Sequence, residues 1–275
     1  MALTATRHVA ATGSNTSPYD TWAKAATTLV SAVAGAAAGD VIVMSKTYTE
    51  TITSALTIDI STTNTNPYAV MCGTPAATSG LSDLTPGAVI TVSTGAISLK
   101  GSAYYSGITF IMSQAASLGM VLAPNNSGIM RFDNCSFQIS GGGSGSVIDI
   151  GGYTAGGGSA CTLNNCTFKY SHALQRISVM GGNVQINGGS ILSGGTAPST
   201  FLGIDSSNRG ITNLRVFGGF DMSNGATGIF LANTGSFRSV FSDIILPTSW
   251  SGTPCSSPAV GEVTELYQSY ANTTL

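Results

Sequence analysis

The sequence predicts an all-β fold, a single-stranded right-handed parallel β-helix with about 27 residues per coil and a capping α-helix at its N-terminus. Three observations predict it. A short apolar strand phrase returns at steps of roughly 23 to 31 residues, and a second phrase keeps a similar step from another place in each unit. Between the two, a third strand runs into a polar corner. Each unit therefore reads as strand, variable loop, strand, corner and strand.

The first phrase is an alternating strand that ends on an apolar residue. Its last apolar residues are Phe110, Phe137, Phe168, Ile191, Val216 and Ile245. Side chains of a strand alternate between its two faces, so one row of these residues is expected to stack inside the coils. The alternation of period two, rich in Val, Ile, Phe and Thr, excludes a helical repeat.

The second phrase and the corner support the same unit. The central residues of the second phrase are Leu122, Ile150, Met180, Ile204 and Leu231. The corners are expected at Asn134, Asn165, Gly188, Asn213 and Asp243. Asn, Gly and Asp enter the left-handed backbone region most easily, and a tight corner needs it. Stacked units pair their strands in parallel, and crossover connections between parallel strands are right-handed.

The two ends of the chain differ from the repeat. Residues 1–17 are rich in Ala, Thr, Ser and Gly and are expected to form an extended arm outside the coils. Residues 18–39 carry an Ala-rich amphipathic pattern that predicts the capping helix. The β-helix is expected over 40–247, with a long insertion at 61–87. Residues 248–275 then form a C-terminal cap or contact segment, with a closing helix at 260–270.

The start of the coils resembles a known family. The order helix, Ala38-Gly39-Asp40, apolar strand and Lys46-Thr47-Tyr48-Thr49-Glu50 resembles the opening of the pectate-lyase-like right-handed β-helix superfamily. Ser45-Lys46 stands where that superfamily usually has Gly. The resemblance covers about residues 20–245 and implies the fold. It leaves the activity open, because the superfamily includes lyases, hydrolases, esterases, tailspikes, adhesins and inert virion components.

Composition narrows the class of protein. Only 8% of the residues are charged, against roughly a quarter in an ordinary soluble domain, and the net charge is −2. There is no basic field to hold phosphates, so nucleic acid is not expected as a partner. No run approaches 18 uninterrupted apolar residues, so no membrane partner is expected. The first residues lack the apolar core of a signal peptide, which predicts synthesis in a host cytoplasm.

Catalytic groups do not align in the repeat. Polysaccharide-cleaving β-helix enzymes need carboxylates on neighbouring coils, whereas Asp133 aligns with Asn164 and Asn187. Arg131 is expected to pair with Asp133 on the same strand face. His172 and Arg176 follow Phe168 and could approach Asp149, which aligns with Val179, Gly203 and Phe230. No Gly-x-Ser-x-Gly elbow or Cys-x-x-Cys pair occurs, so no catalytic residue, cofactor or metal site is predicted.

The cysteines, threonines and tyrosines raise three further possibilities: a disulfide, an ice-binding face and a glycan-binding face. Cys135 and Cys166 occupy one position in consecutive units; two buried thiols are favoured over a disulfide. No Thr-x-Thr ladder supports an ice-binding face. A glycan-binding face would need aligned aromatic residues, and its candidates are Tyr104, Tyr105, Tyr153 and Tyr170.

These observations favour a structural assembly. The sequence is expected to encode a non-enzymatic bacteriophage virion component, most like the small β-helical capsid decoration or head-fibre proteins. Its expected partners are two further copies, in a homotrimer, and the major capsid protein or another virion protein. The alternative is a tail-associated spike or a polysaccharide-degrading β-helix enzyme. Particle attachment is expected on the uncharged arm, at Val9, Ala10, Ala11, Thr12, Gly13, Ser14, Asn15, Thr16 and Ser17.

Overall fold

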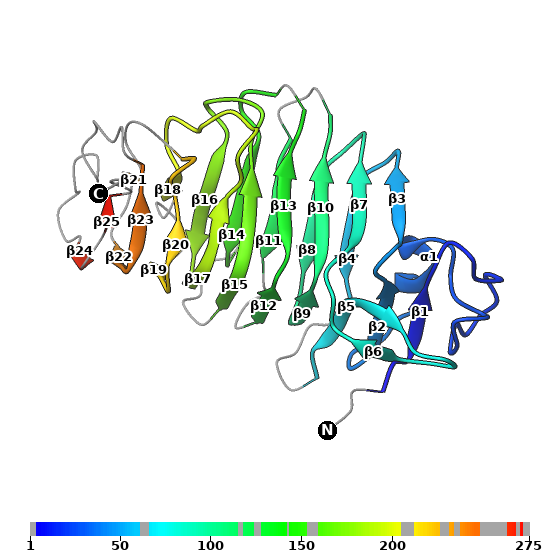
Figure 1. The fold of residues 1–275 in the computed structure, drawn as a ribbon. Helices are drawn as coiled ribbons and strands as arrows, with labels where there is room; N and C mark the ends of the chain where they lie inside the picture. The colour runs from blue at the N-terminus through cyan, green and yellow to red at the C-terminus, as the bar shows by residue number, and fades with distance from the viewer. Residues whose placement is uncertain are drawn as a thin grey trace.

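The chain is all-β, with 51% of residues in strands, and its strands run parallel in curled sheets. The computed structural model describes residues 4–60, 66–114, 118–123, 128–141, 143–152, 159–204, 212–225, 231–233, 237–247, 263–267 and 270–271. Figure 1 shows the strands side by side along one elongated body, from the blue N-terminal end to the red C-terminal end. This arrangement is compatible with the predicted β-helix.

The large curled sheet contains two ladders. In the first ladder each strand pairs in parallel with the strand one unit further along the chain. Its strands are β1 (Arg7–Val9), β2 (Val41–Ser45), β5 (Tyr68–Pro75), β9 (Ala103–Ser106), β12 (Ile129–Asp133), the first halves of β15 (Ala160–Lys169) and β17 (Asn183–Ile191), β19 (Thr212–Phe217), β22 (Phe237–Ser242) and β24 (Val263–Tyr267).

The second ladder follows the corner of each unit and is also parallel. Its strands are β3 (Thr49–Ile52), β7 (Ala88–Val92), β10 (Ile108–Met112), β13 (Ser136–Ile139), the second halves of β15 and β17, β20 (Phe220–Asp221), β23 (Ile244–Leu246) and β25 (Tyr270–Ala271).

A separate parallel sheet of seven strands completes the units. Its strands are β4 (Leu56–Asp59), β8 (Ile97–Lys100), β11 (Met120–Ala123), β14 (Val147–Gly151), β16 (Arg176–Gly181), β18 (Leu202–Ile204) and β21 (Leu231–Asn233).

The core is a set of stacked apolar rows, as the alternation predicts. Phe110, Phe137, Phe168 and Ile191 are successive register partners in the second ladder, and all four are buried. The predicted interior stack is therefore confirmed for these four residues, but not for Ile245, which pairs with Asp221 in the row of Ser190 and is only partly buried. In the first ladder Tyr68 and Tyr105 are buried as well, and their hydroxyl groups are hydrogen-bonded to each other across 2.5 Å.

The corners adopt the left-handed backbone that the sequence predicts. Asn134, Asn165 and Asp243 have φ angles of 54°, 50° and 52°, and Gly188 has 63°. The backbone N–H of Asn134 donates to the Asn164 carbonyl across 2.9 Å, so successive corners are bonded to one another.

One predicted corner is wrong. Asn213 lies inside β19, and the corner of that unit is at Gly218, with a φ of 69°. Ser190 pairs with Asp221, so the register partner of Ile191 is Met222 and not Val216. The register also moves three smaller assignments. Asp149 pairs with Ser178 and not with Val179, and Ile150 pairs with Val179 and not with Met180. Ile204 pairs with Asn233, and Leu231 pairs with Leu202. Phe217 occupies the row in which a polar residue was expected, and this obscured the Gly-Gly corner.

The N-terminal cap differs from both predictions for it. The helix expected over 18–39 is not seen; only α1 (Leu29–Val33) is helical. Within the arm expected at 1–17, Arg7–Val9 does not lie outside the coils, because β1 pairs with β2 and Val9 is fully buried. The backbone of Ala26 bonds to the outer edge of β1 on either side of Val9, donating to the carbonyl of His8 and accepting from the N–H of Ala10. The segment therefore covers the first strand with backbone hydrogen bonds instead of helix side chains.

The predicted insertion and the predicted closing helix also differ from the structure. The insertion expected at 61–87 is wrong over 68–73, because this stretch of β5 is a strand of the first ladder. Beyond it, β6 (Leu81–Asp83) runs antiparallel to the end of β5 in a hairpin. The closing helix expected at 260–270 is wrong where the chain is described, because Val263–Tyr267 is a strand of the first ladder. The rest of the C-terminal segment 248–275, except Tyr270–Ala271, lies outside the described residues.

Candidate functional site

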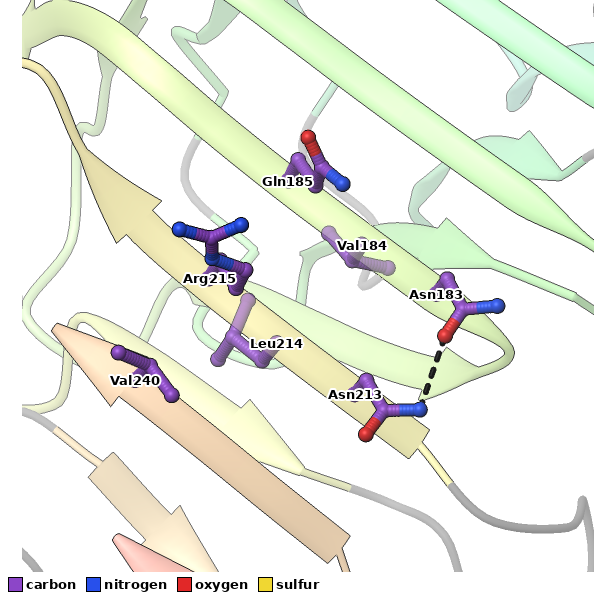
Figure 2. Close-up of a pocket in the computed structure, with 7 residues that line it drawn as sticks. All are labelled: Asn183, Val184, Gln185, Asn213, Leu214, Arg215 and Val240. Carbon is purple, nitrogen blue, oxygen red and sulfur yellow. Dashed lines mark hydrogen bonds between the residues drawn. The ribbon is translucent and has the colours of Figure 1, made fainter. Parts of the chain in front are cut away.

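A groove of about 370 Å³ lies on the first ladder across three strands, β17, β19 and β22 (Figure 2). Its size falls within the range of small-ligand sites. The lining residues are Asn183, Val184, Gln185, Asn213, Leu214, Arg215 and Val240.

Strand alternation explains which side chains reach the groove. Val184 and Leu214 are fully buried, so their neighbours Gln185 and Arg215 project from the opposite face. Gln185 and Arg215 are register partners on adjacent strands. Figure 2 shows these two side chains on the same side of the sheet, above the strand ribbons.

Among the described residues, the groove has a hydrogen-bonded pair of amide side chains at one edge and one cationic side chain, Arg215. Asn213 donates from Nδ2 to Oδ1 of Asn183 across 2.9 Å, as the dashed line in Figure 2 marks. The guanidinium carbon of Arg215 lies 5.1 Å from the ring centroid of Phe217, which favours a cation–π contact. No carboxylate with a described side chain pairs with Arg215.

The chemistry of this groove suits binding. Amide groups donate and accept hydrogen bonds, and an arginine binds hydroxyl-rich or carboxylate-bearing ligands well. The described lining residues include no His, Cys, Asp or Glu, so none of them is a candidate general base or nucleophile.

The predicted pair of Arg131 and Asp133 is confirmed and belongs to a larger cluster. Arg131 donates from Nε and Nη2 to the two oxygens of Asp133 across 2.9 and 2.8 Å. The Tyr104 hydroxyl donates to Asp133 Oδ2 across 2.9 Å, and Asn164 Nδ2 donates to Oδ1 across 2.7 Å. Burial alone would raise the pKa of Asp133, but these three donors together hold it below its usual value. The carboxylate is thus fully engaged by its neighbours.

The carboxylates do not pair with one another in the described ladders. Asp133 lies beside Ser106 and Asn164, as the sequence predicts for Asn164, and Asn164 lies beside Asn187. Asp149 lies beside Val121 and Ser178. Within the described residues no group of three or more His, Cys, Asp or Glu side chains is placed to hold a metal ion.

The two residues predicted to approach Asp149 are Arg176, at the start of β16, and His172, in the turn before it. Arg176 is the register partner of Val147, two residues before Asp149, and is exposed. His172 lies in the turn before β16, where its Nδ1 accepts the backbone N–H of Leu174 across 3.1 Å.

The four cysteines in the described residues, Cys72, Cys135, Cys161 and Cys166, are buried free thiols. Cys135 and Cys166 precede the register partners Ser136 and Thr167, so they lie in one row as predicted. Burial raises the pKa of Cys135 to about 12, which keeps the thiol protonated and unreactive.

The tyrosine candidates for a glycan face do not align. Tyr105 and Tyr170 are buried, Tyr104 projects beside Arg131, and Tyr153 lies outside the described residues.

Sequence reasoning missed a row of hydroxyl groups on the outer side of the second ladder. Thr109, Ser136, Thr167 and Ser190 are successive register partners, and Thr167 donates to the Ser136 hydroxyl or accepts from it across 2.9 Å. The row mixes Thr with Ser, so a search for Thr-x-Thr alone does not find it. The residue before each stacked Phe or Ile is the signal that reveals it.

The residues proposed for attachment divide into two groups. Val9 and Ala10 are buried, and Gly13 packs so closely on Ala25 that a Cβ atom would lie 2.2 Å from the Ala25 carbonyl oxygen. The remaining residues are exposed: Ala11, Thr12, Ser14, Asn15, Thr16 and Ser17. Only this exposed group is available for contact with another protein.

Comparison with known proteins gives no relative. No protein-family model matches the chain, and no curated protein or solved structure matches it either. In the described residues, no helix has the length and apolar character needed to cross a bilayer.

Proposed function

We propose that this protein is a right-handed parallel β-helix that serves as a non-enzymatic structural component of a bacteriophage virion, a capsid decoration protein that assembles as a homotrimer. The observation that carries the proposal is the isolation of the carboxylates: no register pair in the described ladders joins two of them. Glycoside hydrolysis in this kind of fold requires two carboxylates that face one bond.

The surface chemistry supports the proposal. Two pairs of charged side chains neutralise each other locally: Arg7 with Asp40 at 3.3 Å and Arg131 with Asp133 at 2.8 Å. The outer row of Thr and Ser on the second ladder is uncharged. Surfaces with few unpaired charges lose little hydration energy when they are covered by another subunit.

Counting copies in purified particles tests the proposed location. Quantitative mass spectrometry should find hundreds of copies per particle, as capsid decoration requires. A handful of copies would place the protein in the tail, and its absence from particles would overturn the virion proposal. Light scattering of the purified protein should give three times the chain mass of 27.7 kDa; a monomer would overturn the trimer.

The exposed part of residues 9–17 is the proposed attachment surface. Thr12→Arg adds a large cation to it, whereas Thr94→Arg adds the same group at an exposed turn elsewhere. The proposal expects Thr12→Arg to reduce the number of particle-bound copies and Thr94→Arg to leave it unchanged. Equal occupancy for both variants would place attachment elsewhere on the protein.

The groove favours a second candidate, a tail-associated spike that contacts or degrades polysaccharide. Gln185, Arg215 and the Asn183–Asn213 pair present hydrogen-bonding groups side by side on adjacent strands. Glycan binding that is lost in Arg215→Ala would support this candidate. Release of reducing or unsaturated ends from capsular polysaccharide, lost in Asp133→Asn or Asp149→Asn, would establish an enzyme and overturn the first proposal.

A further inference from the structure

His8 is a fully buried histidine whose two ring nitrogens have different partners. Nδ1 lies 2.8 Å from the carbonyl oxygen of Tyr19, and a carbonyl only accepts, so Nδ1 carries the proton. Nε2 lies 3.1 Å from the backbone nitrogen of Gly80, and an N–H only donates, so Nε2 carries none. The two bonds together require the neutral imidazole with its proton on Nδ1.

Trp22 is hydrogen-bonded to the same hairpin tip. Its indole N–H donates to the Gly80 carbonyl across 2.8 Å, and its backbone N–H donates to the Thr78 carbonyl across 3.3 Å. The Trp22 and His8 rings meet edge to face, with centroids 4.7 Å apart. The tip of the hairpin between β5 and β6, residues 76–80, is therefore fastened to the N-terminal cap by these two side chains.

An apolar patch lies on the outer side of the sheet beneath this hairpin. Val41 and Val43 of β2 contact Ala69 and Met71 of β5, and Leu81 of the hairpin packs against them. Trp22 and Tyr104 border the same cluster. Figure 1 shows β6 beside β2 and β5 at the N-terminal end of the body.

We propose that His8 is an acid-sensitive latch: protonation of Nε2 removes the acceptor for the Gly80 N–H and releases the hairpin tip 76–80 from the cap. A protonated imidazole has two donors, so Nε2–H would face the Gly80 N–H directly. Release uncovers the edge of the apolar patch formed by Val41, Val43, Ala69 and Met71.

The charged groups on the segments that pack near His8 come from four parts of the chain. Asp20 and Lys24, on the segment that carries Trp22, pair at 3.0 Å. Arg7 on β1 pairs with Asp40 at the start of β2. Asp83 on β6 is bonded to Thr74 and Thr85. Each of these groups already has a partner.

The environment of His8 indicates that its protonation, and with it the release of the hairpin tip, occurs below neutral pH. Burial lowers the pKa of His8, and the Tyr19 carbonyl and the Asp20 charge oppose that shift without reversing it. A released His8 regains a pKa of about 6.5, so the open form binds the proton more readily than the closed form. The latch is therefore stable at neutral pH and weakens as pH falls below about 6.5.

Two measurements on the wild-type protein test this inference. Nitrogen chemical shifts of the His8 ring at pH 7.5 should show the neutral form with the proton on Nδ1. Hydrogen exchange at the Gly80 amide, corrected for its intrinsic rate, should accelerate by about tenfold per pH unit between the open-state and closed-state pKa values. The Thr167 amide, which donates to the Cys135 carbonyl, is the control and should not accelerate.

Variants separate the latch from general acid sensitivity. His8→Gln keeps an acceptor but does not titrate, so the Gly80 amide should lose its pH response; His172→Gln should keep it. Trp22→Phe removes one tie to Gly80 and should speed its exchange at every pH while the pH response remains. A proton on Nε2 at pH 7.5, or protection of Gly80 that is unchanged down to pH 5, would overturn the latch even if no variant folds.

Discussion

The rings of Phe110 and Phe137 lie on adjacent strands and stack nearly parallel, with centroids 6.0 Å apart and planes 8° apart. Phe168 continues the stack, 5.9 Å beyond Phe137. Each ring therefore fills space that both neighbours line, and none of the three is exposed.

Phe137→Ala should lower the free energy of unfolding by about 3–5 kcal/mol, because it leaves a cavity between two rings that cannot close it. Urea denaturation followed by circular dichroism measures the loss. Gln138→Ala, at the next position and on the outer face, should change stability by no more than about 0.5 kcal/mol. Equal effects of the two substitutions would contradict the assigned interior row.

Asn165→Ala should cost about 1–2 kcal/mol, because a Cβ-bearing residue without a local hydrogen-bonding side chain is disfavoured at a φ of 50°. Asn165→Gly should cost less, since Gly adopts this conformation without steric conflict. Thermal denaturation of the pair gives the comparison. An Ala variant as stable as the Gly variant would show that the corner tolerates ordinary backbone angles.

Asp133 should make stability depend on acid pH. Its pKa is lowered in the folded protein, so its contribution is complete above the unfolded value of about 3.9 and is lost as pH falls through the folded pKa. Asp133→Asn should therefore be less stable than wild type at pH 7, and the difference should shrink as pH falls below about 4. Urea midpoints between pH 7 and pH 2.5 measure it. A difference that stays constant with pH would mean that the charge of Asp133 is not what stabilises the cluster.

The buried thiols should not react in the folded protein. In a Cys255→Ser background, a thiol reagent at pH 8 should label none of Cys72, Cys135, Cys161 and Cys166 until denaturant is added, because burial raises the pKa of each thiol and excludes the reagent. Rapid labelling of Cys135 without denaturant would place that row at the surface.

The sequence could predict the interior rows because burial imposes a strict alternation, as Phe137 and Phe168 show. It could also predict corners such as Asn134 and Asn165, since few residues tolerate the backbone they require. The prediction missed the corner at Gly218, because Phe217 stands where the other corners have a polar residue.

The prediction of an N-terminal capping helix was wrong for a different reason. The Ala-rich pattern favours a helix locally, but β1 needs backbone partners, and the Tyr19 and Ala26 backbones supply them in non-helical segments. The groove depends on which outward residues of separate units become neighbours. Gln185 and Arg215 meet only because the corner falls at Gly218, so the groove could not be found from the sequence with that corner misplaced.

The backbone that covers β1 also affects how copies of the protein can associate. A parallel sheet with a bare first strand can recruit another chain by strand addition and grow into a fibre. Here the outer edge of β1 is already occupied by hydrogen bonds to Tyr19 and Ala26 of the same chain. Growth of a fibre by strand addition to β1 is therefore blocked, because a second copy finds no free hydrogen-bonding edge on this strand.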